Sequence, residues 1–211
     1  NGVECMIVAN DATVKGGIYY ALGLVAGGAL TGYLTRPALS IPFLILAVFC
    51  LWFFRDPDRT IPAGPVAVSP ADGKVVAVRP EGAVTRVSIF LNVFDVHVNR
   101  SPIAGKITEV RYKTGKFLVA SREEATTDNE QNFITVEGEG TKIVFSQITG
   151  LIARRIVCYK KAGDVVQAGE RVGYIKFGSR VDVFLGPEWN IEVKEGERVS
   201  AGSSILARRK A

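Results

Sequence analysis

The sequence predicts a mainly β body preceded by an N-terminal helical hairpin. An apolar stretch ends at residue 54, and from residue 64 onward short β-branched runs alternate with turns that contain glycine, such as Asp72-Gly73. Strand-length runs bounded by turn residues are typical of antiparallel sheets. No long stretch of this second part has a helical period. We therefore expect a helical hairpin over residues 1–54 and a β-rich domain over residues 55–211.

The first unit has the pattern of a membrane hairpin. Residues 16–35 and 37–54 carry no charged side chain, and only Arg36 separates them. Each segment is close to the length that crosses a hydrocarbon core about 30 Å thick. Arg55 and Arg59 follow an aromatic cluster, which places the body on the cytoplasmic face of the cell membrane. Whether the hairpin spans the bilayer or only inserts is left open, and a signal peptide or a buried core hairpin are the alternatives.

Composition excludes several kinds of site and partner. The chain has one histidine and three scattered cysteines, so a multi-histidine metal centre is impossible and no metal is expected. The net charge is +5, and it belongs entirely to the body because the charges of residues 1–54 cancel. A basic body suits nucleic acid or an anionic lipid surface. The sequence carries no recognised nucleic-acid motif, so we expect an anionic membrane and no nucleic acid.

The body contains an internal repeat. Two segments, which begin at Lys161 and Lys194, share the pattern Lys-x-Gly-x-x-Val-x-Ala-Gly. Repeated hairpins of this kind are typical of biotinyl/lipoyl-type barrel-sandwich folds. Such a scaffold allows an enzyme, or a membrane-anchored carrier or adaptor without catalysis. A carrier needs a lysine at a hairpin tip, and the link between the repeats, FLGPEWNIEV, has none.

One short segment between the repeats carries reactive chemistry. Phe177-Gly178-Ser179-Arg180 interrupts a strand pattern. A glycine leaves its own carbonyl sterically open, and an adjacent serine hydroxyl attacks such a carbonyl when a base removes the proton. A simple turn is the plainer interpretation of an isolated Gly-Ser pair.

Three further segments favour the reactive interpretation. They are Phe53–Pro57 (FFRDP), Ser69–Gly73 (SPADG) and Phe94–Pro102 (FDVHVNRSP). In this order, and followed by residues 177–180, they resemble the phosphatidylserine decarboxylase family, in particular its short form. The resemblance covers nearly the whole chain.

The resemblance implies an enzyme that makes its own cofactor. Ser179 would attack the carbonyl of Gly178, and the chain would split into a large chain, 1–178, and a small chain, 179–211, whose first residue becomes a covalent pyruvoyl group. This carbonyl would form a Schiff base with phosphatidylserine and accept electrons as carbon dioxide leaves, giving phosphatidylethanolamine. Phosphatidylserine and an anionic membrane are the implied partners, and a homo-oligomer is left open.

The resemblance also assigns roles to single residues. Asp72 matches the carboxylate of the family's maturation triad, which orients an imidazole, and His97 matches the first histidine of the family's histidine segment. The long form carries a second histidine three positions later, and it is this second one that belongs to the triad. Here that position is Arg100, which leaves the maturation role of His97 open.

Three more residues are candidates for substrate binding. Arg180, beside the reactive carbonyl, could hold a phosphate or a carboxylate, and a surface arginine is the alternative. Asn129 and Asn132 belong to a polar segment that resembles an Asn-Glu-x-Asn segment of the family.

Overall fold

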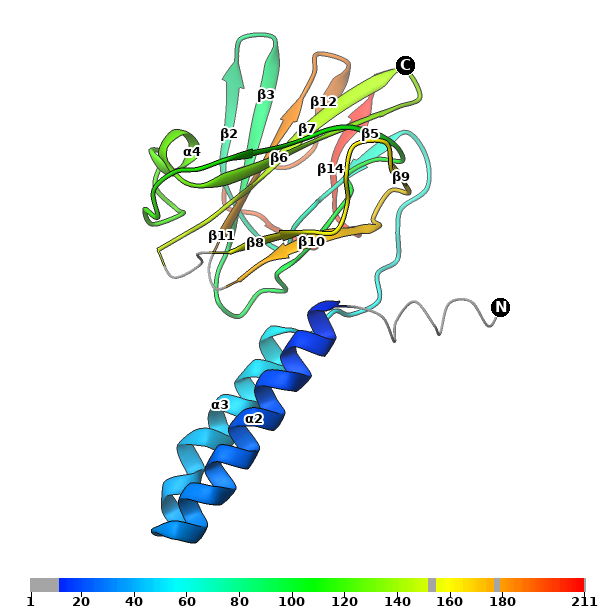
Figure 1. Ribbon diagram of the computed structural model, residues 1–211. Coiled ribbons are helices and arrows are strands. Elements are labelled where there is room, and N and C mark those ends of the chain that lie inside the picture. The colour runs from blue at the N-terminus through cyan, green and yellow to red at the C-terminus, as the bar shows by residue number, and fades with distance from the viewer. Residues whose placement is uncertain (1–11, 152–154, 177–178, 211) are drawn as a thin grey trace, which may run out of the picture. The chain divides into compact units, whose positions relative to one another are not determined.

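The computed structural model describes residues 12–151, 155–176 and 179–210. The chain divides into two compact units, residues 1–57 and 58–211 (Figure 1).

The first unit is helical in its described part. Helix α2 (Ala12–Leu34) is followed by the short 3₁₀ helix η1 (Pro37–Ser40) and by α3 (Ile41–Phe53). Small residues let the two long helices approach closely: a Cβ atom on Gly28 would lie 2.8 Å from the Cβ of Phe43. Residues 16–34 are long and apolar enough to cross a membrane by length and composition, and α3 is shorter.

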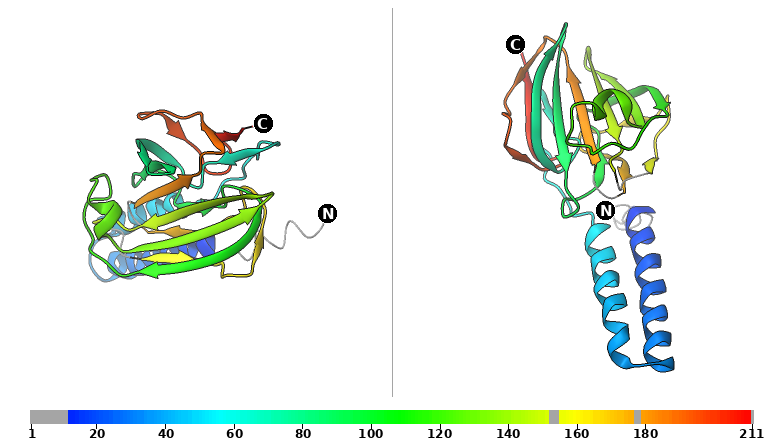
Figure 2. Two further views of the ribbon diagram at one scale, coloured as in Figure 1. Left: turned by 90° about the horizontal axis from the view of Figure 1, so that it is seen from above. Right: turned by 90° about the vertical axis from the view of Figure 1, so that its left-hand side faces the viewer.

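The body is built from antiparallel strands. In the described part of the chain they form three sheets, and the largest of these is strongly curled (Figure 2). Its order is β13 (Arg198–Val199), β2 (Gly73–Glu81), β3 (Val84–Leu91), β11 (Ser179–Leu185), β7 (Thr141–Ile148), β6 (Gln131–Gly138), β5 (Gly105–Lys113) and β9 (Val165–Val166).

Two smaller sheets complete the body. Their orders are β4 (Val98–Arg100), β10 (Arg171–Ile175), β8 (Ile156–Cys158), and β1 (Val66–Val68), β14 (Ile205–Arg209), β12 (Trp189–Ile191). A single helical turn, α4 (Ala125–Asp128), precedes β6. The prediction of a mainly β body with an N-terminal apolar helix is therefore confirmed.

The hydrophobic core lies along one face of the large sheet. Alternate residues of the central strand β11, Val181, Val183 and Leu185, are fully buried in it. Because side chains alternate across a strand, Ser179 points to this same face and Arg180 points to the other.

The internal repeat appears as two equivalent arrangements. The first repeat forms β9 and β10, which pair with β5 and β4, and the second forms β13 and β14, which pair with β2 and β1. The two strands of one repeat lie in different sheets, so the expectation that each repeat is a hairpin is wrong. The chain crosses between sheets at the turn that contains each Ala-Gly pair.

The duplication extends further than the two repeats. Ser69 and Ser101 each begin a Ser-Pro-x-x-Gly-Lys turn, and each Oγ donates to the carbonyl two residues on, at 2.6 Å and 2.7 Å. The backbone N–H of Gly202 donates to Ser69 O, and that of Gly169 donates to Ser101 O, both at 2.8 Å. This second repeat spans only six residues, of which Ser, Pro, Gly and Lys are shared, so the sequence alone gives a weak signal of it.

Replacing Gly73 by alanine should destabilise the body strongly. Gly73 has a φ of +145°, and a Cβ atom there would lie 2.2 Å from Phe90 O on the paired strand. Gly82→Ala is the matched control, because Gly82 also has a positive φ but its Cβ would meet open space. We expect a loss of about 3 kcal/mol for Gly73→Ala and about 1 kcal/mol for the control in urea unfolding. Equal losses would show that the contact with Phe90 is unimportant.

Candidate active site

Ser179 opens the central strand of the large sheet. It lies opposite Leu91 of β3, and the next residue, Arg180, lies opposite Ile148 of β7. The Ser179 side chain is 0% exposed, and its Oγ has no hydrogen-bond partner among the described residues. Gly178, which would supply the scissile carbonyl, lies outside the described residues. A buried hydroxyl without a partner costs free energy, which is typical of a group with a chemical role.

Three buried amide side chains lie on the Ser179 side of the sheet. Gln147 is paired with Val181 of β11 and with Asn132 of β6, so it shares their face. Its Nε2 donates to Asn99 Oδ1 at 2.9 Å, and its Oε1 accepts from Asn132 Nδ2 at 3.0 Å. We call these three residues the amide cluster. It joins the large sheet to β4, which carries Asn99.

The amide cluster has unused hydrogen-bonding capacity. Asn99 Nδ2 is buried and has no partner among the described residues. The Cys158 thiol of β8 contacts Asn132, and burial raises the pKa of this thiol while the hydrogen bonds to Lys160 and Asn132 oppose the rise. An unpartnered amide donor on the same side of the sheet as the buried Ser179 hydroxyl would suit a small carbonyl-bearing group at residue 179. The site thus fits a pyruvoyl group formed from Ser179.

His97 immediately precedes β4, two residues before Asn99 of this cluster. It is buried, and its Nδ1 is 2.9 Å from Asp95 O. A carbonyl can only accept, so Nδ1 carries the proton, and proton transfer by this side chain would use Nε2. The backbone N–H of Ile175 donates to His97 O at 3.3 Å. The backbone of the histidine is therefore fixed to the strand that leads toward Ser179.

A tight turn holds this histidine in place. The Asp95 carboxylate accepts from the backbone N–H of Asn92 at 2.9 Å, and the Asp95 N–H donates to Asn92 O at 3.0 Å. Arg198 of β13 forms an ion pair with the same carboxylate. Asp95 thus links two parts of the body: its backbone carbonyl orients His97, and its carboxylate binds Arg198 of the second repeat.

Asp72 has partners other than His97. Its carboxylate accepts two hydrogen bonds from Arg59 Nη2, at 2.8 Å and 3.0 Å, and one from the backbone N–H of Ala201 at 2.8 Å. The equivalent position in the other half of the duplication is Ala104, so a carboxylate is not required by the turn itself. A triad contact between Asp72 and His97 stays a prediction.

Arg100, at the position of the family's second histidine, has a structural contact. It is buried, and its Nη1 donates to Gly169 O at 3.0 Å, in the turn of the first repeat.

Arg180 belongs to a buried charge cluster on the face opposite Ser179. It is 1% exposed, its Nε donates to Asp182 Oδ1 at 2.6 Å, and its Nη2 donates to Ser88 Oγ at 2.7 Å. Arg86 donates to the same Ser88 at 2.7 Å and lies 3.7 Å from Asp182. Glu123 pairs with Arg86 and borders the cluster. The alternative of a surface arginine is therefore wrong, and the guanidinium of Arg180 is already engaged.

The charge cluster also fixes a neighbouring loop. Arg180 Nη1 donates to Arg122 O at 3.2 Å. Burial raises the pKa of Asp182, and the guanidinium groups of Arg180 and Arg86 counteract this effect by favouring the carboxylate.

The two candidate asparagines differ in their surroundings. Asn129 precedes β6, and its side chain is used by the backbone: Nδ2 donates to Leu118 O at 2.9 Å and to Thr149 O at 2.7 Å, and Oδ1 accepts from Leu118 N. Asn132 belongs to the amide cluster. The structure thus places Asn132, but not Asn129, with the polar groups on the Ser179 face. Sequence reasoning missed Asn99 and Gln147, although an amide in the apolar strand of Gln147 was a usable signal.

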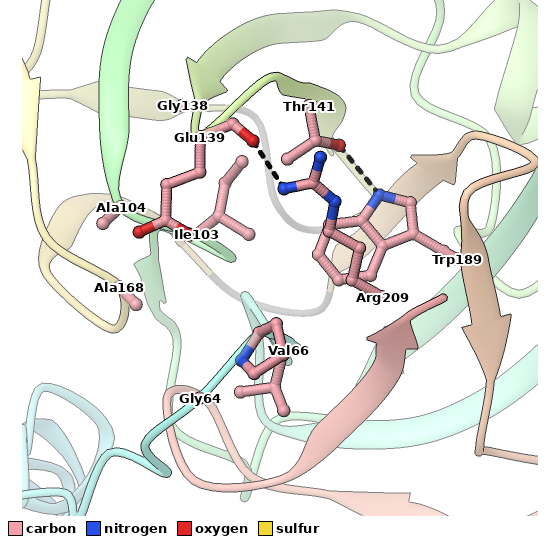
Figure 3. Close-up of a pocket in the computed structure, with 11 residues that line it drawn as sticks. Gly64, Val66, Ile103, Ala104, Gly138, Glu139, Thr141, Ala168, Trp189 and Arg209 are labelled. Atoms are coloured by element: carbon pink, nitrogen blue, oxygen red, sulfur yellow. Dashed lines mark hydrogen bonds between the residues drawn. The ribbon is translucent and has the colours of Figure 1, made fainter. Parts of the chain in front are cut away.

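A separate cavity lies far from Ser179 along the sheet. It has a volume of about 80 Å³ and borders the turn between β6 and β7, at the opposite end of β7 from Ile148 (Figure 3). Trp189 Nε1 donates to Thr141 Oγ1 at 3.1 Å, and Arg209 Nη1 donates to Glu139 O at 2.5 Å. Its lining includes none of the candidate catalytic or substrate-binding residues.

Removing the Asp182 charge should destabilise the body. Asp182→Asn leaves the buried Arg180 and Arg86 without their shared carboxylate, and we expect a loss of about 3–5 kcal/mol in urea unfolding. Glu192→Gln is the control, because its ion pair with Arg208 is exposed and should contribute at most about 1 kcal/mol. A small and equal loss of stability in both variants would show that Asp182 does not stabilise the buried charge cluster.

Comparisons with known proteins agree with the motif analysis. A family model described as phosphatidylserine decarboxylase matches residues 46–207. The chain is 68% identical over 196 residues to a protein of Solibacter usitatus (strain Ellin6076), a match that covers 93% of this chain and 96% of the relative. It is 48% identical over 197 residues to a protein of Solidesulfovibrio magneticus, covering 89% of this chain and 92% of the relative.

A third relative, from Desulfotalea psychrophila, is 45% identical over 177 residues, which cover 80% of this chain and 83% of the relative. All three proteins carry the name phosphatidylserine decarboxylase proenzyme. The family predicted from the sequence motifs is confirmed: the chain belongs to the phosphatidylserine decarboxylase family.

Proposed function

We propose that this protein decarboxylates phosphatidylserine to phosphatidylethanolamine, with a pyruvoyl group that it makes from Ser179. The observation that carries the proposal is the buried, unpartnered hydroxyl of Ser179 at the start of β11, directly after Gly178. The relatives' common name, proenzyme, supports a cleavage step during maturation.

Maturation begins with the Ser179 hydroxyl. Its Oγ bonds to the carbonyl carbon of Gly178, the hydroxyl proton passes to a base, and the Gly178–Ser179 C–N bond breaks to leave an ester. Loss of the Ser179 α-proton then breaks the Cβ–Oγ bond and frees the carboxylate of Gly178. Water releases ammonia from the remaining dehydroalanine, which leaves the pyruvoyl carbonyl. His97 is the proposed base, supported by its burial and by the Nδ1–H contact with Asp95 O, which orients the ring.

Once formed, the pyruvoyl group would supply an electron sink for the decarboxylation. The other residues of the chain position the substrate and return a proton to it. The amide cluster offers Asn99 Nδ2 as a donor to oxygen atoms at the site, and the covering sheet β4-β10-β8 excludes water. His97 returns a proton to the carbon that loses carbon dioxide.

We also propose that the β body has a fold of the barrel-sandwich type. The duplicated arrangement, in which each repeat crosses between two sheets, supports the barrel-sandwich type. The large chain 1–178 and the small chain 179–211 stay together because β11 is paired on both sides, by β3 and β7.

Membrane attachment rests on the apolar helices. We expect residues 1–54 to associate with the cell membrane and to hold the basic body at its cytoplasmic, anionic face. A homo-oligomer stays a prediction.

Substitution of Ser179 should abolish both cleavage and activity. Ser179→Ala has no hydroxyl to attack Gly178, so denaturing electrophoresis should show one chain, and no phosphatidylethanolamine should form from phosphatidylserine. Ser203→Ala, in a surface turn of the same small chain, is the matched control and should be cleaved normally. Activity in uncleaved Ser179→Ala would sink the pyruvoyl mechanism.

Substitution of His97 should separate its two proposed roles. Because general base catalysis contributes about 10²–10⁴-fold, His97→Ala should slow cleavage by at least about 100-fold. The cleaved fraction of the variant is then incubated with phosphatidylserine, so that the decarboxylation rate is measured separately from the cleavage rate. Normal cleavage with slow turnover would assign His97 to decarboxylation alone, and normal rates of both would remove it from the mechanism.

A further inference from the structure

We infer that Phe94 and Leu151 form a pair of apolar prongs that enter the bilayer interface beside the site. This inference rests on the proposed function, because it assumes that the substrate is a lipid. It assigns a lipid-contacting surface to the β body itself, apart from the helical unit.

The topology places both side chains at the edge where β11 begins. Strands β3 and β7 run antiparallel to β11 and end beside its first residues, at Leu91 and Ile148. Phe94 follows Leu91 by three residues, and Leu151 follows Ile148 by three residues. Three residues reach at most about 10 Å, so both prongs extend from the two strand ends that flank Ser179.

The prongs are apolar and exposed. Phe94 is 67% exposed and Leu151 is 56% exposed. The turn that carries Phe94 is rigid, because the Phe94 N–H donates to Asn92 Oδ1 at 2.8 Å and Asp95 closes the turn from the other side. Large exposed apolar side chains are costly in water and are suited to an interface.

Charge at the same edge favours an anionic lipid surface. Lys176 lies three residues before Ser179, and its backbone N–H donates to Arg155 O at 3.3 Å, so two basic residues adjoin the edge. Arg155 is exposed. Basic side chains beside apolar ones are the combination that binds anionic bilayers.

The chemistry of the substrate points to the same edge. Two acyl chains cannot leave the bilayer without a large cost, whereas Ser179 is fully buried in the body. The headgroup must therefore reach residue 179 while the acyl chains stay in lipid. We therefore place the bilayer at the edge where β11 begins, because residue 179 lies at this end of the strand.

Fluorescence quenching tests the contact without measuring activity. The full chain is reconstituted in vesicles of phosphatidylcholine and phosphatidylglycerol, in which part of the phosphatidylcholine carries brominated acyl chains. Phe94→Trp should add a fluorescence signal that brominated lipid quenches, relative to the wild-type chain with its two tryptophans. Val165→Trp is the control, because Val165 is 69% exposed on β9, at the opposite end of the large sheet. Equal quenching at the two positions would overturn the inference.

Kinetics provide a second measurement. Phe94→Ser combined with Leu151→Ser should raise the phosphatidylserine vesicle concentration for half-maximal rate about tenfold, and should leave the rate on a soluble short-chain phosphatidylserine unchanged. Val165→Ser should change neither. Equal losses on both substrates would mean that the prongs support the site rather than contact lipid. If the wild-type chain decarboxylates neither substrate, the proposed function fails, and the quenching result still decides the inference.

Discussion

The pairing of β11 between β3 and β7 is the constraint on which the rest of the structure depends. Every residue of Ser179–Leu185 is paired with β3, and the first of them is fully buried. A strand held on both sides needs no covalent link at its start. A break before Ser179 therefore leaves the sheet intact and leaves a new chain end fixed in the interior, where water is excluded.

The two faces of β11 have different surroundings and different roles. On one face Ser179 shares the interior with the amide cluster, which joins the large sheet to the small sheet β4-β10-β8 that His97 precedes. On the other face Arg180 and Asp182 join the buried charge cluster with Arg86. Buried ion pairs fix geometry more than they add stability. The charge cluster thus anchors the residues next to Ser179 and leaves the opposite face to the chemistry.

The sequence predicted the mainly β body, the apolar helical unit and Ser179 as a special position, because these depend on local patterns and ordered motifs. It did not predict the partners of the site residues, because these depend on strand register. Asn129 and Asn132 are three residues apart, yet one supports a loop and the other joins the amide cluster. Arg180 is adjacent to Ser179 and still points away from its face. The pairing of Asp72 with Arg59 likewise joins segments that no sequence pattern connects.

The central claim is that residue 179 becomes the cofactor, and the intact mass of the small chain tests it most directly. The purified protein is denatured, and the fragment that begins at residue 179 is weighed. We expect a fragment lighter than the serine-initiated chain by one ammonia, with an end that resists sequential degradation. An active preparation that contains only the uncleaved chain, or a small fragment that begins with an intact serine, would contradict the account.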